Sequence, residues 1–240
     1  MANAEARGPC VGVFVADGAR MGCQLMAAAL RRSRYRLEVA GSSTDSSGVR
    51  AAFAKSKGNI DILLISSQLA DGPLAGLMVA REIRFSHPKV GIIILLDSSE
   101  RAIVVEAFRA GANGILSREQ PFDIVCKCIH SVYQGQVWAS AKEIRYALDA
   151  LTHSDPVDSA ATKSSKGRAL LTEREESVVH LVAEGLTNRD ISRHLNLSEH
   201  TVRNYLFRIF NKVGTSNRLE LALYAINRKQ PAAREQYDYK

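Results

Sequence analysis

Short apolar runs alternate with segments of helical period over the first half of the chain. The apolar runs occupy residues 11–17, 35–40, 60–66, 90–96 and 113–117, and apolar residues recur at spacings of three and four between them. Strands that alternate with helices build parallel sheets that are buried on both faces. The pattern therefore predicts a doubly wound sheet of five parallel strands with five helices within residues 10–135.

The character of the chain changes after this region. Residues 140–152 have the period of a further helix, and residues 153–168 are small, polar and without apolar periodicity. We interpret residues 136–168 as a linker helix followed by a flexible linker, and residues 169–230 as a second domain.

Strong helix-start and helix-stop signals mark this second domain. Its caps are Thr172 with Glu175, Thr187 with Asp190, and Ser198, and Gly185 suits a helix end. They predict a short helix, a tight turn and a longer helix, which is the helix-turn-helix arrangement.

The longer helix has two distinct faces. Val202, Leu206, Ile209 and Val213 form one stripe that must pack inward. The candidate DNA-binding residues lie on the other face, at its edges and in the preceding helix: Ser198, His200, Thr201, Arg203, Asn204, Phe207, Arg208, Asn211, Lys212, Arg189 and Arg193. Cations suit phosphates, while Arg, Asn and apolar groups suit base edges and thymine methyls.

Charge supports this interpretation without proving it. The 240-residue chain has a net charge of +7, and residues 188–229 hold eight basic residues against three acidic ones. Such charges alone equally fit a solvated helix face. The helix-turn-helix context favours a polyanionic partner.

Residues 170–226 resemble the four-helix DNA-binding domain of the NarL/LuxR family of bacterial transcription regulators, through elements such as "EGLTNRDIS" and "LSEHTVRNYLFRIFNKVG". The resemblance implies that Arg203, Asn204 and Phe207 face base edges. It also implies that the last helix pairs two such domains, so that a homodimer binds an inverted repeat in double-stranded DNA.

The first domain then resembles a flavodoxin-like response-regulator receiver in shape but not in chemistry. At the family's magnesium-binding acid pair this chain has Asp17 and Gly18, and at the phosphoryl-acceptor aspartate it has Ser66. Leu96 replaces the family's hydroxyl residue, Arg118 its lysine and Ile115 its aromatic switch residue. We expect an atypical receiver that lacks the aspartyl-phosphate switch. The alternatives are that Ser66 is phosphorylated, or that Asp97 or Asp71 supplies the missing carboxylate.

Two roles remain open for such a receiver. It dimerises through its first and fifth helices, or a pocket lined by Ser66, Ser67, Leu96 and Arg118 binds a small ligand or a protein partner. For Arg118 the competing interpretation is an ordinary surface arginine. The competing function for the whole chain is an interaction scaffold or anti-activator with little independent DNA-binding role.

The sequence gives little support for an enzyme, a metalloprotein, a membrane protein or an exported protein. The four cysteines, Cys10, Cys23, Cys126 and Cys128, are scattered, and we interpret them as small buried hydrophobic residues in a reducing compartment. No catalytic constellation is evident, and we expect no metal, no cofactor and no enzymatic activity. His180, His194 and His200 are interpreted as core, surface and groove residues. The chain has no apolar run of membrane-spanning length and no signal-peptide pattern at its start, so we expect a cytoplasmic protein.

Overall fold

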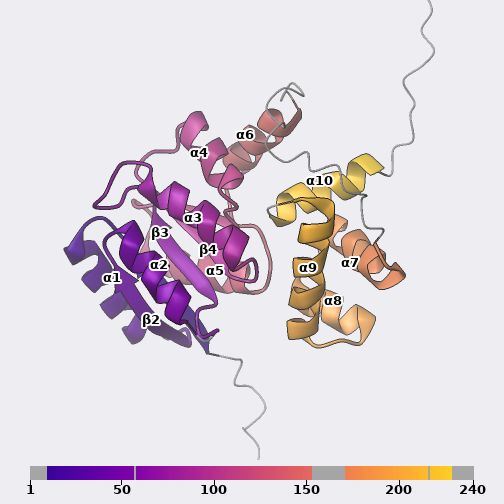
Figure 1. Cartoon of the computed structure of the whole chain (residues 1–240), viewed down its shortest axis with the longest axis horizontal. Helices are drawn as coiled ribbons and strands as arrows, with labels where there is room; N and C mark the ends of the chain where they lie inside the picture. Colours follow the sequence, from indigo (N-terminus) through magenta and orange to yellow (C-terminus); the bar gives the residue numbers. More distant parts are fainter. Residues whose placement is uncertain (1–9, 57, 153–170, 216, 229–240) are drawn as a thin grey trace, which may run out of the picture. The chain divides into compact units, whose positions relative to one another are not determined.

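A computed structural model describes residues 10–56, 58–152, 171–215 and 217–228. The chain divides into two compact units, with the division between Lys166 and Gly167 (Figure 1). Each unit has its own hydrophobic core. The predicted flexible linker at 153–168 lies outside the described residues.

The first unit contains the predicted sheet of five parallel strands, in the order β2-β1-β3-β4-β5. The strands begin and end within a few residues of the predicted runs: β1 (Val11–Ala16), β2 (Leu37–Ser43), β3 (Ile62–Ser66), β4 (Gly91–Leu96) and β5 (Gly114–Ser117). This order is the flavodoxin-like one that the sequence predicts.

Helices cover both faces of the sheet, because alternate residues of each strand point to opposite sides. Val11, Val13 and Val15 belong to the core that the sheet shares with α1 (Arg20–Arg32) and α5 (Phe122–Tyr133). Phe14 points the other way and makes an edge-to-face contact with Phe53 of α2. The helices of this second face are α2 (Ser46–Lys55), α3 (Ala75–Ser86) and α4 (Arg101–Arg109) (Figure 1).

The first unit continues past residue 135, where the sequence places the domain boundary. Trp138 pairs with the backbone of β5, through its own N–H to the Asn113 carbonyl and its carbonyl to the Ile115 N–H. The following helix, α6 (Ala141–Thr152), packs against α4, and Arg101 of α4 pairs with Asp149 at 3.8 Å. The helix predicted as a linker is thus part of the α/β unit.

The second unit is all-helical and contains the predicted four helices. They are α7 (Glu173–Ala183), α8 (Asn188–Leu195), α9 (Glu199–Val213) and α10 (Arg218–Arg228). All three predicted N-caps are confirmed: Thr172 and Thr187 form full capping boxes, and the Ser198 hydroxyl accepts the Thr201 N–H. Gly185 follows α7 with a φ of +81°, as a helix end requires.

Some smaller expectations are wrong. Cys10 is exposed, whereas Cys23, Cys126 and Cys128 are buried as small hydrophobic residues. His180 is not a core residue, because it is exposed and lies 2.9 Å from the Glu184 carboxylate on the next turn of α7. In the part of the chain that the structure describes, no helix is both long and apolar enough to cross a membrane.

Candidate DNA-binding face and carboxyl-edge cluster

Helix α9 is held in place by its inward stripe and by its ends. Val202, Leu206 and Ile209 are buried in the core of the second unit. The Ser198 hydroxyl starts the helix, and Gly214, with a φ of +77°, ends it. A rigid helix with a fixed rotation presents a defined set of side chains to solvent, as direct readout of a DNA groove requires.

The outward face contains the residues that the helical wheel selects. His200, Arg208 and Asn211 are exposed, and Arg203, Asn204 and Phe207 are half-buried. Tyr205 and Phe210, by contrast, pack against the core. Phe207 therefore brings an aromatic ring to a surface that otherwise carries charges and hydrogen-bonding groups.

Asn204 is poorly satisfied on this face. Its amide nitrogen lies 3.3 Å from Nδ1 of His200, and its side-chain oxygen is buried without a hydrogen-bond partner among the described residues. A buried acceptor without a donor costs free energy. The side chain would gain a hydrogen bond by turning toward an outside donor.

Only some of the basic residues of the second unit are exposed near the outward face of α9. Arg189 and Arg193 are exposed on α8, and Arg193 has an acid, Asp190, at 3.9 Å. Lys212, a candidate phosphate contact, instead donates a 2.6 Å hydrogen bond to Glu175, whose side chain is only 3% exposed. Lys212 thus ties the end of α9 to the start of α7.

Two further arginines stabilise the unit. Arg218 is buried and donates to Asn188 at 3.2 Å and to the Leu186 carbonyl, and its burial lowers the pKa of the guanidinium to about 10. Arg228 pairs with Glu176 at 3.2 Å. The cations that the solvent-facing surface of α8 and α9 offers are Arg189, Arg193, Arg203 and Arg208.

A second group of polar residues gathers at the carboxyl edge of the parallel sheet. We call Asp17, Ser66, Asp97 and Arg118 the carboxyl-edge cluster. Asp17 follows β1, Ser66 ends β3, Asp97 follows β4 and Arg118 follows β5. Parallel strands bring these positions together even though they are far apart in the sequence.

The Arg118 guanidinium is the centre of this cluster. It donates to Asp17 Oδ2 at 2.6 Å and to Ser66 Oγ at 2.7 Å, and its Nε lies 2.7 Å from Asp97 Oδ1. The other oxygen of Asp17 accepts the Ala19 N–H at 2.9 Å, and the Asp17 side chain is 7% exposed. Burial opposes the charge of Arg118, but the bonds to Asp17 and Asp97 outweigh it and raise the pKa of the guanidinium.

The interpretation of Arg118 as an ordinary surface arginine is therefore wrong. Its side chain is 36% exposed, yet each guanidinium nitrogen contacts an oxygen atom of Asp17, Ser66 or Asp97. An outside anion would have to compete with two carboxylates that belong to the chain itself.

The positions beside the carboxyl-edge cluster leave little room for further polar side chains. A Cβ atom on Gly18 would lie 3.0 Å from the Leu69 main chain, so a side chain at this position is crowded unless that main chain moves by a few tenths of an ångström. Leu96 is fully buried. Of the two alternative acids, Asp97 reaches the cluster, while Asp71 accepts the Ser46 N–H at the start of α2.

No metal-binding group of three or more His, Cys, Asp or Glu side chains occurs within residues 10–56, 58–152, 171–215 and 217–228. The cluster itself contributes two carboxylates, and both already contact the Arg118 cation.

The two units together define a class of protein. An α/β receiver-like unit, with its polar cluster at the carboxyl edge of the sheet, is followed by a helix-turn-helix unit. Residues 169–225 match the family described as bacterial regulatory proteins, luxR family. The oxygen regulatory protein NreC of Staphylococcus epidermidis is 25% identical over 193 residues, which cover 80% of this chain and 87% of the relative. NreC of Staphylococcus aureus strain MRSA252 is 27% identical over the same length.

Solved structures agree on the fold. The response regulator RcsB in its DNA complex superposes with a TM-score of 0.51 at 18% identity, over 91% of this chain and all of that chain. The isolated receiver domain of RcsB from Salmonella enterica serovar Typhimurium gives 0.50 at 17% identity, over 57% of this chain and 99% of that one. Over both units, the chain is similar to DNA-binding response regulators, and its second unit matches the luxR family of bacterial regulatory proteins.

Sequence reasoning missed three features of these sites: the tie between Lys212 and Glu175, the burial of Arg218, and the convergence of Arg118 on Asp17 and Asp97. Arg218 and Asn188 both lie in the family-like motifs "SNRLEL" and "EGLTNRDIS", which is a signal for a structural role. The Arg118 contacts had no local signal, because Asp17 and Arg118 are 101 residues apart.

Proposed function

We propose that this protein regulates transcription by binding an inverted repeat in double-stranded DNA as a homodimer, with α9 of each protomer in the major groove. The observation that carries the proposal is the outward face of α9, which combines Arg203, Asn204 and Phe207 beside exposed Arg208. RcsB, the fold neighbour, is known in complex with DNA and as dimers bound to DNA.

Each residue of this face has a chemical role in the proposal. Arg203 binds a guanine edge in a bidentate manner, and Asn204 satisfies its unpaired oxygen by accepting from an adenine amino group. Phe207 contacts a thymine methyl. Arg189, Arg193 and Arg208 bind phosphates and fix the register of the helix, with Ser198 and Thr201 at its first turn.

We further propose that the receiver is not switched by aspartyl phosphorylation. Ser66 at the strand end has no carboxylate to accept a phosphoryl group, and Arg118 already pairs with Asp17 and Asp97. The cluster does not fit a magnesium ion, which needs several oxygen ligands in octahedral geometry. A cation of the chain takes the place that such an ion would need.

Intact-mass spectrometry after incubation with acetyl phosphate and Mg²⁺ tests this second proposal. We expect the unmodified mass only, and DNA affinity unchanged by the treatment, because no activated acceptor is present. A receiver with a conventional aspartate pocket is the positive control. Accumulation of a species heavier by one phosphoryl group would refute phosphorylation independence and leave the DNA-binding proposal intact.

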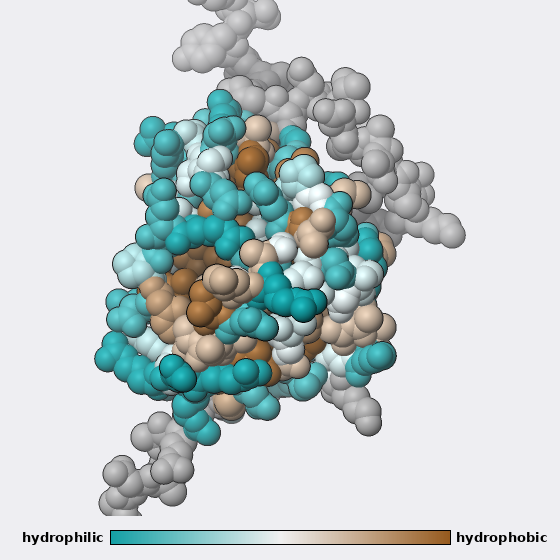
Figure 2. Space-filling view, turned by 90° about the vertical axis from the view of Figure 1, so that its left-hand side faces the viewer, coloured by the Kyte–Doolittle hydropathy of each residue, from teal (hydrophilic) through white to brown (hydrophobic). Residues whose placement is uncertain are grey.

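Dimerisation through the first unit has support on α1. Met21 is 70% exposed and Leu25 is 64% exposed on consecutive turns of this helix. Figure 2 faces the side on which α1 lies and shows a brown apolar patch bordered by teal hydrophilic groups. Apolar side chains within a polar rim are typical of subunit interfaces. A ligand at the carboxyl-edge cluster has weaker support, because Arg118 is bound within it.

One observation favours the alternative of a protein-interaction scaffold. Met78 and Phe85 of α3, with Leu74 just before it, are large exposed apolar residues. Salt titration separates the two functions. Specific DNA binding through several phosphates weakens steeply as salt rises, whereas binding of a protein partner to these apolar residues depends little on salt.

A further inference from the structure

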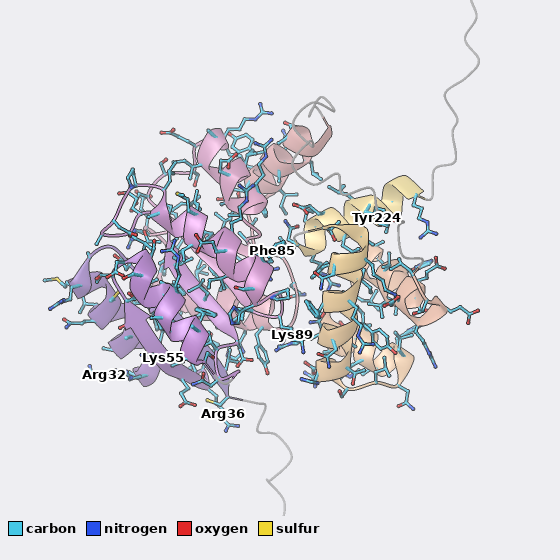
Figure 3. The ribbon with its side chains drawn as sticks, in the orientation of Figure 1. Arg32, Arg36, Lys55, Phe85, Lys89 and Tyr224 are labelled. Carbon is cyan, nitrogen blue, oxygen red and sulfur yellow. The ribbon has the colours of Figure 1, made fainter. Side chains whose placement is uncertain are left out.

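Exposed cations gather at the edge of the first unit that is opposite the carboxyl-edge cluster. Parallel strands all begin at this edge, and the helices that precede them end there. Five basic residues lie at these helix ends and strand starts: Arg31, Arg32, Arg36, Lys55 and Lys89. We call them the amino-edge cations. Figure 3 labels four of them, which lie along the lower border of the first unit.

The charges of the first unit are therefore separated along the strand direction. Asp17 and Asp97 follow strands at the carboxyl edge, and Asp45 and Asp71 lie at the start of α2 beside it. Among the described residues, few acids lie toward the amino edge, and Glu82, near the end of α3, pairs with Arg50 at 2.7 Å. Asp61 is engaged with the Gly12 N–H at 2.9 Å, and Glu38 is exposed on β2.

Helix dipoles explain part of this arrangement but not all of it. Arg31, Arg32 and Lys55 stand in the last turns of α1 and α2, where a cation is favourable for the helix itself. Arg36 and Lys89 are not in any helix; Arg36 directly precedes β2, and Lys89 lies two residues before β4. The cations thus continue across the edge beyond the positions that stabilise helices.

The edge has a suitable length for a polyanion. From β2 to β4 the sheet order crosses three strand spacings. At about 4.8 Å each, the row spans about 14 Å, which is about the length of four base pairs of duplex DNA. A row of ammonium and guanidinium groups without bidentate base-reading geometry suits phosphates and carries no sequence preference.

We propose that the amino edge of the receiver unit is a second, sequence-independent contact with the phosphate backbone of duplex DNA. The inference rests on the proposed DNA-binding function and deepens it, since α9 would read the operator while the receiver unit holds additional duplex. Affinity would then come from both units of one chain, and the share from the amino edge would be purely electrostatic.

The test uses full-length protein and a 60-base-pair random-sequence duplex, titrated by fluorescence anisotropy between 50 and 200 mM salt. The edge variant combines Arg32→Gln, Lys55→Gln and Lys89→Gln. The matched control combines Arg81→Gln, Lys142→Gln and Arg145→Gln, which remove the same charge from exposed positions on α3 and α6. Circular dichroism verifies that both variants are folded.

We expect the control to keep the wild-type salt dependence and the edge variant to have a shallower one. Three lost phosphate contacts reduce the slope of log K against log salt by about 2.7, so the wild type loses roughly 40-fold more affinity than the edge variant over this range. Equal slopes in all three proteins would overturn the inference while leaving the α9 proposal intact.

Two other outcomes would also contradict the inference. If the wild type binds no duplex at any salt concentration, the proposed DNA-binding function fails and this inference fails with it. If the edge variant keeps the DNA slope but loses binding to phosphatidylglycerol vesicles, the amino edge is a lipid-binding surface and the DNA inference is wrong.

Discussion

Arginine has three different uses in this chain, and residue type alone does not separate them. Arg118 holds two carboxylates and a hydroxyl at the sheet edge, Arg218 is buried and donates to Asn188, and Arg203 lies on the outward face of α9. The helical wheel predicts Arg203 at the edge of the outward face from local period alone, and in the structure this residue is half-buried on α9. Arg118 and Arg218 depend on residues distant in sequence, which no local pattern encodes.

The role of Arg203 is open to a direct prediction. Arg203→Ala should weaken binding to a selected operator by about 1 to 3 kcal/mol and relax the preference at one base pair, because a bidentate contact to guanine is lost. Selection from a random-sequence pool, followed by affinity titration, measures both effects. Arg174→Ala, an exposed arginine on α7, serves as the control and should leave both unchanged. An equal loss on every sequence would identify Arg203 as a phosphate contact.

The lowered pKa of Glu175 makes the free energy of unfolding depend on pH. Burial raises the pKa of this carboxyl, but the bonds from Lys212 and Thr172 outweigh burial and lower it. A lowered folded-state pKa means that the ionised group stabilises the fold above its unfolded pKa of about 4.3, and that this stability is lost as pH falls through the folded-state pKa.

Glu175→Gln keeps a side chain that can complete the capping box but removes the charge. The variant should unfold about 1 to 3 kcal/mol more easily at pH 7, because Lys212 loses its charged partner. Urea titrations at pH 7 and pH 3 should show this difference shrinking in acid. A difference that stays constant with pH would mean that the ion pair contributes nothing beyond packing.

At the scale of elements, the sequence predicts nearly the whole fold. Five strands, their helices and the four C-terminal helices begin and end close to the predicted residues, because apolar period and caps act over short distances. The attachment of α6 to α4 was not predicted. An amphipathic helix shows which of its faces is buried but not which neighbour covers that face.

The turn between α8 and α9 contains the one non-glycine residue with positive φ among those described, Asn196 at +54°. Asn tolerates this left-handed conformation, glycine adopts it freely and alanine does not. We expect Asn196→Ala to lower the free energy of unfolding by about 1 kcal/mol and Asn196→Gly to leave it nearly unchanged. Urea denaturation compares the two variants; equal losses would point to the Asn196 side chain instead of the backbone.

At the scale of the whole molecule, the two compact units allow their contributions to be separated. If the receiver unit dimerises through α1, full-length protein should bind operator fragments as a dimer and more tightly than residues 165–240 alone. Titration with mass photometry gives affinity and stoichiometry together. Met21→Glu with Leu25→Glu should reduce the full-length protein to the affinity of the fragment.

Tighter binding by the fragment would be the opposite result. It would mean that the receiver unit hinders α9, and that control of this protein consists of removing that hindrance.

The cation at the carboxyl edge is a side chain of the protein itself, so it cannot be added or removed after the chain has folded. A diffusible ion or phosphoryl group has an occupancy that a cell can raise or lower within one protein's lifetime. Arg118 has a fixed local concentration beside Asp17 and Asp97, set when the chain folds. If the receiver unit is not phosphorylated, as we propose, no occupancy varies at this edge and the adjustable quantity is the number of folded molecules. Synthesis and degradation would then set how fast the output of such a regulator can change.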